Sequence, residues 1–311
     1  MLRISGLDVT FADGTRGVRG ATFDVMEGEV VGVAGQSGSG KTVTALSIIG
    51  LLPPGATAGG SIMYRDRELI GLSERTWTQL RGREVSMIFQ ETTTALNPVV
   101  RIGKQLMLAA RANTGIDRAS AHRRVTEMLI DVGLKDHSRV MASYPHELSG
   151  GMCQRVMIAM ALSCGASLLI ADEPTTALDV SVQRDVIDVI KRVAAEHGLA
   201  VIFVSHDLGV LEELCDRVVV MYSGEVVEVG LTADIIARPQ HPYTQALLAS
   251  VPRLDGARRR SVNLGAPVGA DVEGCRFRLR CGLATDVCAR HPDLVAENGH
   301  AVRCWLAGGD R

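Results

Sequence analysis

Residues 35–42 read Gly35-Gln36-Ser37-Gly38-Ser39-Gly40-Lys41-Thr42, which fits the phosphate-loop pattern G-x-x-x-x-G-K-[ST]. Glycines at these positions let the backbone curl so that successive amide N–H groups point at phosphate oxygens. The Lys41 ammonium supplies a positive charge for the terminal phosphates, and the Thr42 hydroxyl is a ligand for Mg²⁺. The stretch therefore predicts an ATP site in which residues 35–42 contact the nucleotide.

The sequence on either side of this loop supports the prediction. Val30–Ala34 is a continuous apolar run typical of a buried strand, and residues 43–49 have the pattern of a helix. This order of strand, loop and helix is the setting that the pattern requires, because the helix directs the positive end of its dipole at the phosphates. The alternative, a flexible Gly/Ser linker, would not lie between two apolar runs.

Composition narrows the class of protein. A chain of 311 residues with 46% hydrophobic and 4% aromatic residues is expected to form one large, aliphatic α/β domain with an appendage. The net charge of −2 argues against a nucleic-acid partner, which would favour a basic surface. No apolar run approaches the ~20 residues needed to cross a bilayer, and the first residues lack the apolar segment of an export signal. We therefore expect a cytosolic chain.

Two acidic residues end the aliphatic strand predicted at 167–171. They are Asp172 and Glu173. The carboxyl ends of parallel strands form the ligand-binding edge of an α/β sheet, so both carboxylates are expected near the phosphates. Asp172 can order the Mg²⁺ shell there, and Glu173 can orient or deprotonate the attacking water.

Two more polar residues follow predicted strands. Gln90 comes after the apolar strand at 85–89, and His206 comes after 201–205, which is predicted to be the last strong strand of parallel type. An isolated glutamine or histidine at such a position is commonly structural. Beside a phosphate loop, however, Gln90 is expected at the ligand edge, and His206 is expected to contact the γ-phosphate.

The N-terminal residues 2–34 alternate apolar and polar positions between glycine turns, which predicts a small antiparallel strand group. Phe11 lies in this group ahead of the phosphate loop. An aromatic residue is more often part of the core, but here its face could stack on adenine.

A mainly helical insertion is predicted from about residue 91 to about residue 160. Asp117 caps one of its helices and Gly133 ends it. In the run Leu148-Ser149-Gly150-Gly151-Met152, the serine is a natural N-cap and the glycines expose amides at a helix start. This predicts a second anion-binding helix N-terminus, with an ordinary capped helix as the alternative.

Taken together, these motifs resemble the ATP-binding subunits of ABC transporters, and the match covers roughly residues 2–230. The phosphate loop, Gln90, the 148–152 run, Asp172-Glu173, Asp179 and His206 occur in the order and approximate spacing of that family. The fold implied is a P-loop α/β ATPase core with an antiparallel β subdomain and a helical insertion. We expect residues 1–230 to form this nucleotide-binding domain.

The resemblance implies a role for each matched position. Glu173 would be the catalytic base, His206 the switch histidine and Gln90 the residue that senses Mg²⁺ and water. Mg²⁺ would be held through Thr42, Gln90 and Asp172. The ATP contacts implied are Phe11, residues 35–42, Gln90, Asp179 and His206, together with Ser149, Gly150 and Gly151, which would bind the γ-phosphate held by a second subunit.

Within the family, the chain is most similar to the oligopeptide, dipeptide and nickel importer group. Ala95-Leu96-Asn97-Pro98 and the run from His241 to Leu248, HPYTQALL, are among the signs. Thr92 stands where proline is usual, and Cys153 where a basic residue is frequent. Neither departure removes a group that the chemistry needs.

Membership of this group implies an assembly. The partners expected are a second ATPase subunit, which is usually a related but non-identical chain, two membrane permeases and an extracytoplasmic solute-binding protein. The chain would lie on the cytoplasmic face of the membrane. The alternatives are a soluble ABC ATPase acting in translation or repair, and the ATPase of an exporter.

The C-terminal residues 231–311 are expected to form an extension with clustered cysteines. Cys275, Cys281, Cys288 and Cys304 follow the spacing C-x5-C-x6-C-x15-C, which matches neither paired zinc ribbons nor common ferredoxin runs. The likeness to the peptide importers continues through Gly274-Cys275-Arg276-Phe277 and implies a [4Fe–4S] cluster, with zinc as the alternative. Cys153, Cys164 and Cys215 are expected to be core thiols.

Overall fold

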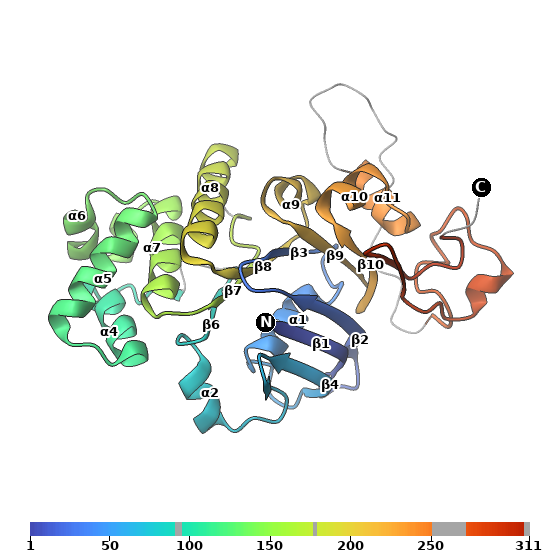
Figure 1. The fold of residues 1–311 in the computed structure, drawn as a ribbon, viewed down its shortest axis with the longest axis horizontal. Helices are drawn as coiled ribbons and strands as arrows, with labels where there is room; N and C mark the ends of the chain where they lie inside the picture. The colour runs from blue at the N-terminus through green and yellow to red at the C-terminus, as the bar shows by residue number, and fades with distance from the viewer. Residues whose placement is uncertain (91–94, 177–178, 251–271, 308–311) are drawn as a thin grey trace. The chain divides into compact units, whose positions relative to one another are not determined.

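The computed structural model describes residues 1–90, 95–176, 179–250 and 272–307 (Figure 1). Residues 91–94, at the start of the predicted helical insertion, lie outside the described residues, as do 251–271 and 308–311 of the predicted extension. The chain divides into two compact units. The first comprises Met1–Val25, Val31–Gly71 and Ser205–Arg311, and the second comprises Met26–Val30 and Leu72–Val204.

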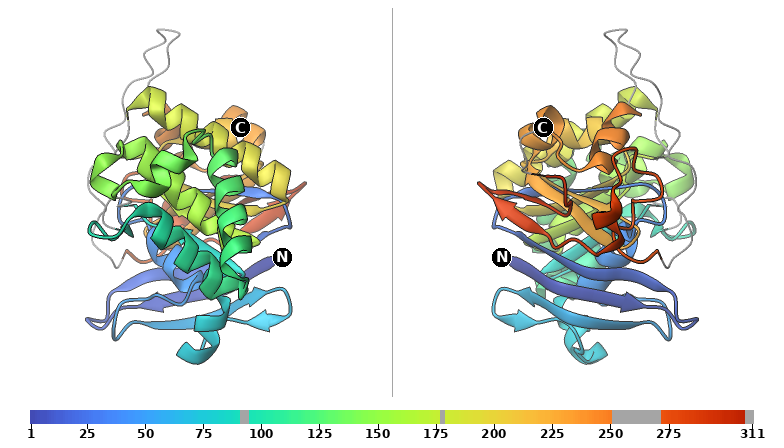
Figure 2. Two further views of the ribbon diagram at one scale, coloured as in Figure 1. Left: turned by 90° about the vertical axis from the view of Figure 1, so that its left-hand side faces the viewer. Right: turned by 90° about the vertical axis from the view of Figure 1, so that its right-hand side faces the viewer.

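The first unit contains the predicted antiparallel strand group. Its sheet has the order β2-β1-β4-β5, with bounds β1 Leu2–Thr10, β2 Arg16–Val25, β4 Thr57–Tyr64 and β5 Arg67–Glu68. Ile4 of β1 lies opposite Phe23 on one side and Ile62 on the other, and all three are buried. The blue strands run side by side in both views of Figure 2. This alternation gives a half-buried sheet, as the sequence predicts.

A second group of strands in the first unit carries the phosphate loop. β3 (Val30–Ala34) is buried throughout, and its residues 31–34 pair in parallel with β9 (Arg217–Tyr222). The prediction that 201–205 is the last strong strand of parallel type is wrong, because β9 follows it in the chain, is almost wholly buried and pairs in parallel with β3. β10 (Glu225–Leu231), β12 (His300–Val302) and β11 (Val295–Glu297) continue from β9 as antiparallel neighbours.

The helices of the first unit flank these strands. They are α1 Lys41–Ile48, α9 Leu208–Leu214, α10 Thr232–Ala237 and α11 Pro242–Ala249. Helix α1 begins directly after the loop residue Gly40, so its free N-terminal amides belong to the phosphate loop.

The second unit holds a parallel group of strands and most of the helices. The strands are β6 Val85–Ile88, β7 Leu168–Asp172 and β8 Ala200–Ser205, paired in parallel in that order. The helices are α2 Glu74–Leu80, α4 Ile102–Thr114, α5 Arg118–Asp131, α6 His137–Ala142, α7 Gly150–Ser163 and α8 Val180–His197, with the short 3₁₀ turn η1 Pro145–Glu147.

Local signals set the ends of these helices. Asp117 accepts a hydrogen bond from Ser120 N at 2.8 Å and begins α5, and Gly133, at φ 81°, lies just beyond its end. Helix α5 packs on α4 and α7, and its side chains Val125 and Leu129 are fully buried. This helical group is drawn in green in Figure 1.

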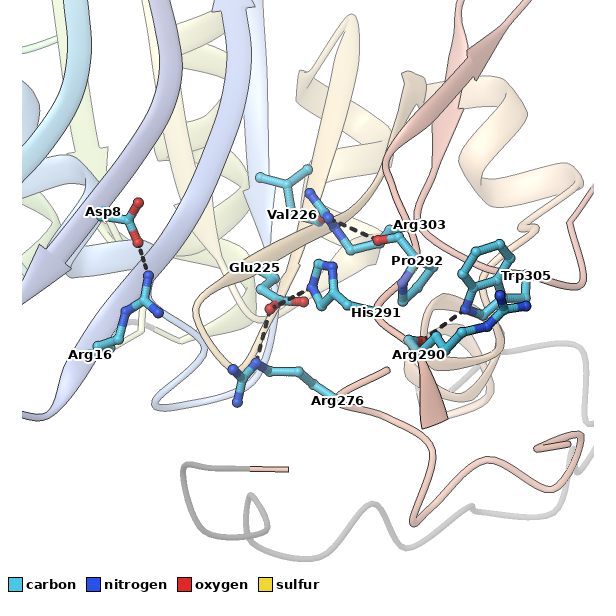
Figure 3. Close-up of polar contacts among 10 residues, drawn as sticks. All are labelled: Asp8, Arg16, Glu225, Val226, Arg276, Arg290, His291, Pro292, Arg303 and Trp305. Atoms are coloured by element: carbon cyan, nitrogen blue, oxygen red, sulfur yellow. Dashed lines mark hydrogen bonds and ion pairs between the residues drawn. The ribbon is translucent and has the colours of Figure 1, made fainter. Parts of the chain in front are cut away.

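The cysteine-containing C-terminal segment, residues 272–307, packs on β10. It also contains the 3₁₀ turn η2 (Asp286–Ala289). The buried Glu225 carboxylate accepts hydrogen bonds from Arg276 Nε at 2.9 Å and from His291 Nε2 at 3.0 Å (Figure 3). Arg303 Nε donates to the Val226 carbonyl at 2.9 Å (Figure 3). Charge-assisted bonds of this kind are about twice as strong as neutral ones, so they fix the segment to the strand.

Further along β10, Glu228 is fully buried and organises the start of α11. Its carboxylate accepts hydrogen bonds from the backbone N–H groups of Gln240 at 2.6 Å and His241 at 3.1 Å, and it contacts His300 Nε2 at 2.8 Å. A buried carboxylate needs such partners, because desolvation without them is costly. The network ties α11 to both β10 and β12.

No helix within the described ranges has the length and apolar character needed to cross a membrane.

Candidate nucleotide-binding site

The phosphate loop runs from β3 to α1 and depends on glycine at two positions. Gly40, with φ 101°, caps α1, and a Cβ there would lie 2.7 Å from the Gly17 carbonyl oxygen. A Cβ on Gly35 would lie 2.4 Å from the Met221 carbonyl oxygen. Both distances are shorter than real Cβ contacts allow, so a side chain at either position would displace the loop.

Lys41 is the first residue of α1 and lies inside the loop. Its Nζ donates to the carbonyl oxygens of Gly35 at 2.7 Å and Gln36 at 3.0 Å, and the residue is only 5% exposed. A buried ammonium within a ring of backbone groups is placed to bind an anion held by the same loop. Thr42 follows it on the first turn of α1.

Ser39 supplies a test of whether a phosphate fits this loop. Its Oγ is buried and has no hydrogen-bond partner among the described residues. A buried hydroxyl without a partner costs roughly 1–3 kcal/mol. A phosphate oxygen bound in the loop is the kind of acceptor that would satisfy it, so the residues present fit a nucleotide phosphate.

Phe11, which is predicted to stack on adenine, lies near Gly17 and the start of α1. A Cβ built on Gly17 would meet the Phe11 ring at 2.7 Å and Val43 of α1 at 3.4 Å. The ring is partly exposed. Stacking of adenine on this ring stays a prediction.

Tyr243 of α11 contacts the loop, and the sequence analysis did not assign it a role. Its hydroxyl oxygen accepts a hydrogen bond from the Gln36 backbone N–H at 3.0 Å. Burial raises the pKa of Tyr243 to about 12, so the phenol stays protonated at neutral pH. The run HPYTQALL indicates the family, and nothing local in it predicts a contact 207 residues away.

In the second unit, the structure brings Gln90 and Glu173 together. Gln90 Nε2 donates to Glu173 Oε2 at 3.4 Å, and Thr176 Oγ1 donates to the same oxygen at 3.0 Å. Asp172, the last residue of β7, is 3% exposed. The two acids therefore end the strand as predicted, with one buried and one partly exposed.

The backbone at Glu173 is unusual. Its φ of 44° lies in the left-handed region, which few non-glycine residues adopt. Its N–H donates to the Val204 carbonyl of β8 at 3.0 Å, which holds this conformation. Strained backbone of this kind costs of order 1–3 kcal/mol and concentrates at functional sites, where it aims a side chain.

Ser149, Gly150 and Gly151 form the start of α7. Ser149 caps the helix by accepting a hydrogen bond from Met152 N at 3.3 Å, and Ser149 and Gly150 are exposed. A Cβ on Gly151 would lie 2.4 Å from Val182 Cγ1, so glycine there lets α8 approach. The first-turn amides of a 14-residue helix are thus presented at the surface, where an anion can reach them.

The other two predicted residues are also exposed. Asp179 is the N-cap residue of α8 in the second unit and makes no side-chain cap bond. His206 follows β8 and belongs to the first unit. Of the predicted site residues, the structure thus places the loop, Phe11 and His206 in the first unit, and Gln90, Asp172, Glu173, Asp179 and the α7 start in the second.

The seven cysteines are all free thiols. Burial, together with the neighbouring Cys288, Cys304 and Cys281, raises the pKa of Cys275 to about 11, so the four thiols gather in one region. Within the described ranges, however, no three His, Cys, Asp or Glu side chains are arranged to hold a metal ion. Cys153, Cys164 and Cys215 are buried, as expected of core thiols.

Comparison with known protein families gives two matches. Residues 18–176 match the family described as ABC transporter, and residues 227–288 match the oligopeptide/dipeptide transporter C-terminal region. The first match spans the phosphate loop, the α7 start and both strand-end acids. The second begins in β10 and includes Tyr243, Phe277 and the first three clustered cysteines.

Relatives of known name cover nearly the whole chain. It is 42% identical to the dipeptide transport ATP-binding protein DppD of Bacillus subtilis, over 98% of this chain and 94% of the relative. It is 43% identical to the oligopeptide transport ATP-binding protein OppD of Salmonella typhimurium, over 95% of this chain and 90% of the relative. Among solved structures, the fold matches the ADP- and Pi-bound dimer of the ATP-binding cassette MJ0796, with a TM-score of 0.66, 26% identity and coverage of 75% and 99%.

Proposed function

The chain belongs to the ATP-binding subunits of ABC transporters and is a transport ATPase, and on this premise we propose that its transporter imports peptides or related small solutes. The observation that carries the choice of solute is the match of residues 227–288 to the C-terminal region of oligopeptide and dipeptide transporters. The two relatives named above are peptide transport proteins and support the same choice.

We propose that ATP binds with its phosphates in residues 35–42 and its adenine on Phe11. The buried Lys41 ammonium and the unsatisfied Ser39 hydroxyl support this arrangement. Thr42, Asp172 and Gln90 would hold Mg²⁺, which would neutralise negative charge on the phosphates. The loop amides and Lys41 would then stabilise the charge that develops on the transferred phosphoryl group.

Glu173 is proposed as the base that orients and deprotonates water for attack on the γ-phosphorus. Its left-handed backbone, its partial exposure and its contact with Gln90 support this role, because strained backbone concentrates at functional sites. Gln90 would position Mg²⁺ and the water, and His206 would contact the γ-phosphate.

The exposed start of α7 supports a site completed by two subunits. We propose that Ser149, Gly150 and Gly151 bind the γ-phosphate of ATP held by a paired ATPase subunit, and that Asp179 links the two sites. ATP would then close the pair, and hydrolysis would reopen it. The paired subunit is proposed to be a related, non-identical chain.

The wider assembly follows from this proposal. Two permeases and an extracytoplasmic solute-binding protein would complete the importer, with this chain on the cytoplasmic face of the membrane. Residues 1–230 would form the nucleotide-binding domain, with the helical insertion at about 91–160 against the permeases, and residues 231–311 would form a C-terminal extension.

Reconstitution tests this function. Vesicles carrying the permeases and both ATPase subunits, with the solute-binding protein outside and ATP inside, are expected to accumulate a labelled dipeptide or oligopeptide. The same vesicles loaded with ADP, or offered the free amino acids, serve as controls. ATP hydrolysis that responds to ribosomes and not to the permeases would contradict the proposal and favour a soluble ABC ATPase.

We propose further that Cys275, Cys281, Cys288 and Cys304 take up a [4Fe–4S] cluster. Four free thiols gathered around Cys275 supply the donors that such a cluster prefers. Because they are not arranged as a metal site within the described ranges, loading would have to draw the sulfurs together. Zinc is the alternative occupant, since four thiolates suit it as well.

Anaerobic purification tests the cluster directly. The wild-type protein is expected to be brown and to contain iron and acid-labile sulfide, and Cys275→Ser is expected to lose both. The matched control is Cys153→Ala, because Cys153 is a buried thiol of α7, and this variant should keep the colour. A colourless wild-type protein with stoichiometric zinc would identify the other metal, and a protein free of both would contradict metal binding.

A further inference from the structure

One peptide group of the phosphate loop is held from both sides. The carbonyl of the Gly35–Gln36 peptide accepts from Lys41 Nζ at 2.7 Å, and its N–H donates to the Tyr243 hydroxyl oxygen at 3.0 Å. A positive charge on the carbonyl polarises the peptide, which makes its N–H a better donor. If the Lys41 ammonium leaves the Gly35 carbonyl to bind a phosphate, the hydrogen bond to Tyr243 still holds this peptide group.

Tyr243 itself is held rigidly. The residue is 0% exposed, and its own N–H donates to Nδ1 of His241, which caps α11, at 3.0 Å. Burial lowers the pKa of His241 to about 3, so the imidazole stays neutral and Nδ1 remains an acceptor. The buried Glu228 fixes the backbone N–H of His241 in turn. The tyrosine hydroxyl is therefore presented to the loop at a set position.

The third support for Tyr243 comes from the cysteine segment. The Phe277 ring packs edge to face against the rings of Tyr243 and Tyr222, with centroid-to-centroid distances of 5.6 Å and 5.3 Å. The centroids of the Tyr222 and Tyr243 rings are 4.6 Å apart. All three residues are less than 5% exposed. Phe277 is two residues from Cys275, whose N–H donates to the Cys288 carbonyl at 2.9 Å. The aromatic cluster of Tyr222, Tyr243 and Phe277 thus joins the cysteine segment to the phosphate loop.

We propose that Tyr243 is a positioning residue for the phosphate loop, and that the C-terminal cysteine segment sets the ATP affinity of this subunit through the contact of Phe277 with Tyr243. The proposal rests on the ATP site argued above. A change in the cysteine segment that moves Phe277 would release the Tyr243 ring, weaken the bond to Gln36 and loosen the loop. ATP would then have to order the loop on binding, which weakens affinity.

The first test removes only the hydroxyl. In the assembled transporter, Tyr243→Phe is expected to raise the KM and Kd for ATP by roughly 2- to 10-fold, the effect of one hydrogen bond, and to leave kcat at saturating ATP unchanged. The matched control is Tyr64→Phe, which removes the hydroxyl of a buried tyrosine of β4 that lies outside the aromatic cluster. Its KM is expected to equal that of the wild type.

The pH dependence of this effect separates positioning from ionisation. Because the pKa of Tyr243 is raised to about 12, the phenol does not ionise near neutrality. The deficit of Tyr243→Phe should therefore be the same at about pH 7 and about pH 9. A deficit confined to the higher pH would contradict a hydrogen bond accepted by the neutral hydroxyl.

The second test addresses the coupling. Phe277→Leu keeps most of the buried volume but loses the edge-to-face contacts, and Phe277→Ala removes them altogether. Both are expected to raise the KM for ATP. The increase in Phe277→Ala should be the larger of the two and should not exceed the increase in Tyr243→Phe. The double variant Phe277→Ala/Tyr243→Phe should be no weaker in ATP binding than the weaker single variant, since both act through one hydroxyl.

The outcomes distinguish this inference from the proposed function. If the wild type does not bind ATP, the ATP site itself is wrong. If the wild type binds ATP and Tyr243→Phe binds it equally well, the positioning role is wrong. Additive losses in the double variant, or equal losses in Tyr64→Phe and Tyr243→Phe, would contradict transmission through the hydroxyl.

Discussion

Lys41→Ala is expected to lower the affinity for ATP by at least roughly 100-fold. The side chain is a buried ammonium that donates within the loop, and a hydrogen bond to a charged partner contributes about 1.5–3 kcal/mol. When ATP binds, the Lys41 ammonium would exchange its two bonds to backbone carbonyls for two bonds to phosphate oxygens. The alanine variant cannot form either of these phosphate bonds. Equilibrium titration with MgATP measures the loss.

The control for this variant is Lys104→Ala. Lys104 is exposed on α4 in the second unit, outside the phosphate loop. Its replacement by alanine therefore removes the same charge from the chain and leaves the loop unchanged. Its affinity for ATP should match the wild type within experimental error. Equal affinity in Lys41→Ala and the wild type would count against residues 35–42 as the nucleotide site.

Glu173→Gln is expected to bind ATP normally and to hydrolyse it at least roughly 100-fold more slowly. The amide has the shape of the carboxylate and can still accept from Thr176, but it cannot take a proton from water. General base catalysis contributes typically 10²–10⁴-fold, which sets the scale of the loss. Phosphate release at saturating ATP gives the rate, and the same titration as above gives the affinity.

Glu196→Gln is the matched control, because Glu196 is an exposed carboxylate in the last turns of α8. Its turnover should equal that of the wild type. Normal hydrolysis by Glu173→Gln would show that another group activates the water, and the assignment of the base would be wrong.

Much of the architecture could be predicted because its signals are local. The strand before the loop is a continuous aliphatic run, and α5 lies between Asp117 and Gly133, whose cap bond and positive φ are properties of those residues alone. The order of the motifs predicted the fold class for the same reason. Each motif carries its own geometry, so no knowledge of distant contacts was needed.

The features that were missed depend on contacts between distant segments. The bond between Gln36 and Tyr243 joins residues 207 positions apart, and no periodicity predicts which tyrosine will reach a loop. The left-handed backbone at Glu173 is set by the carbonyl of Val204 on another strand. The strand β9 did carry a local signal, the apolar run Val218-Val219-Val220-Met221-Tyr222, which the sequence analysis overlooked.

The gathering of the four cysteines lies between these cases. Their spacing in the chain names no known motif, so the sequence indicated a metal only through family resemblance. Their proximity depends on β10, which fixes the segment through Glu225 and the Val226 carbonyl. Long-range packing of this kind cannot be read from the spacing.

The central claim is that one ATP is held by the loop of one subunit and the α7 start of the other. The most direct measurement is the structure of the Glu173→Gln transporter, with its permeases and paired ATPase subunit, trapped with MgATP. The account predicts the Ser149 hydroxyl and the Gly151 N–H within hydrogen-bond distance of the γ-phosphate held by the paired subunit. A closed, ATP-filled pair in which the α7 start lies far from every γ-phosphate would contradict it.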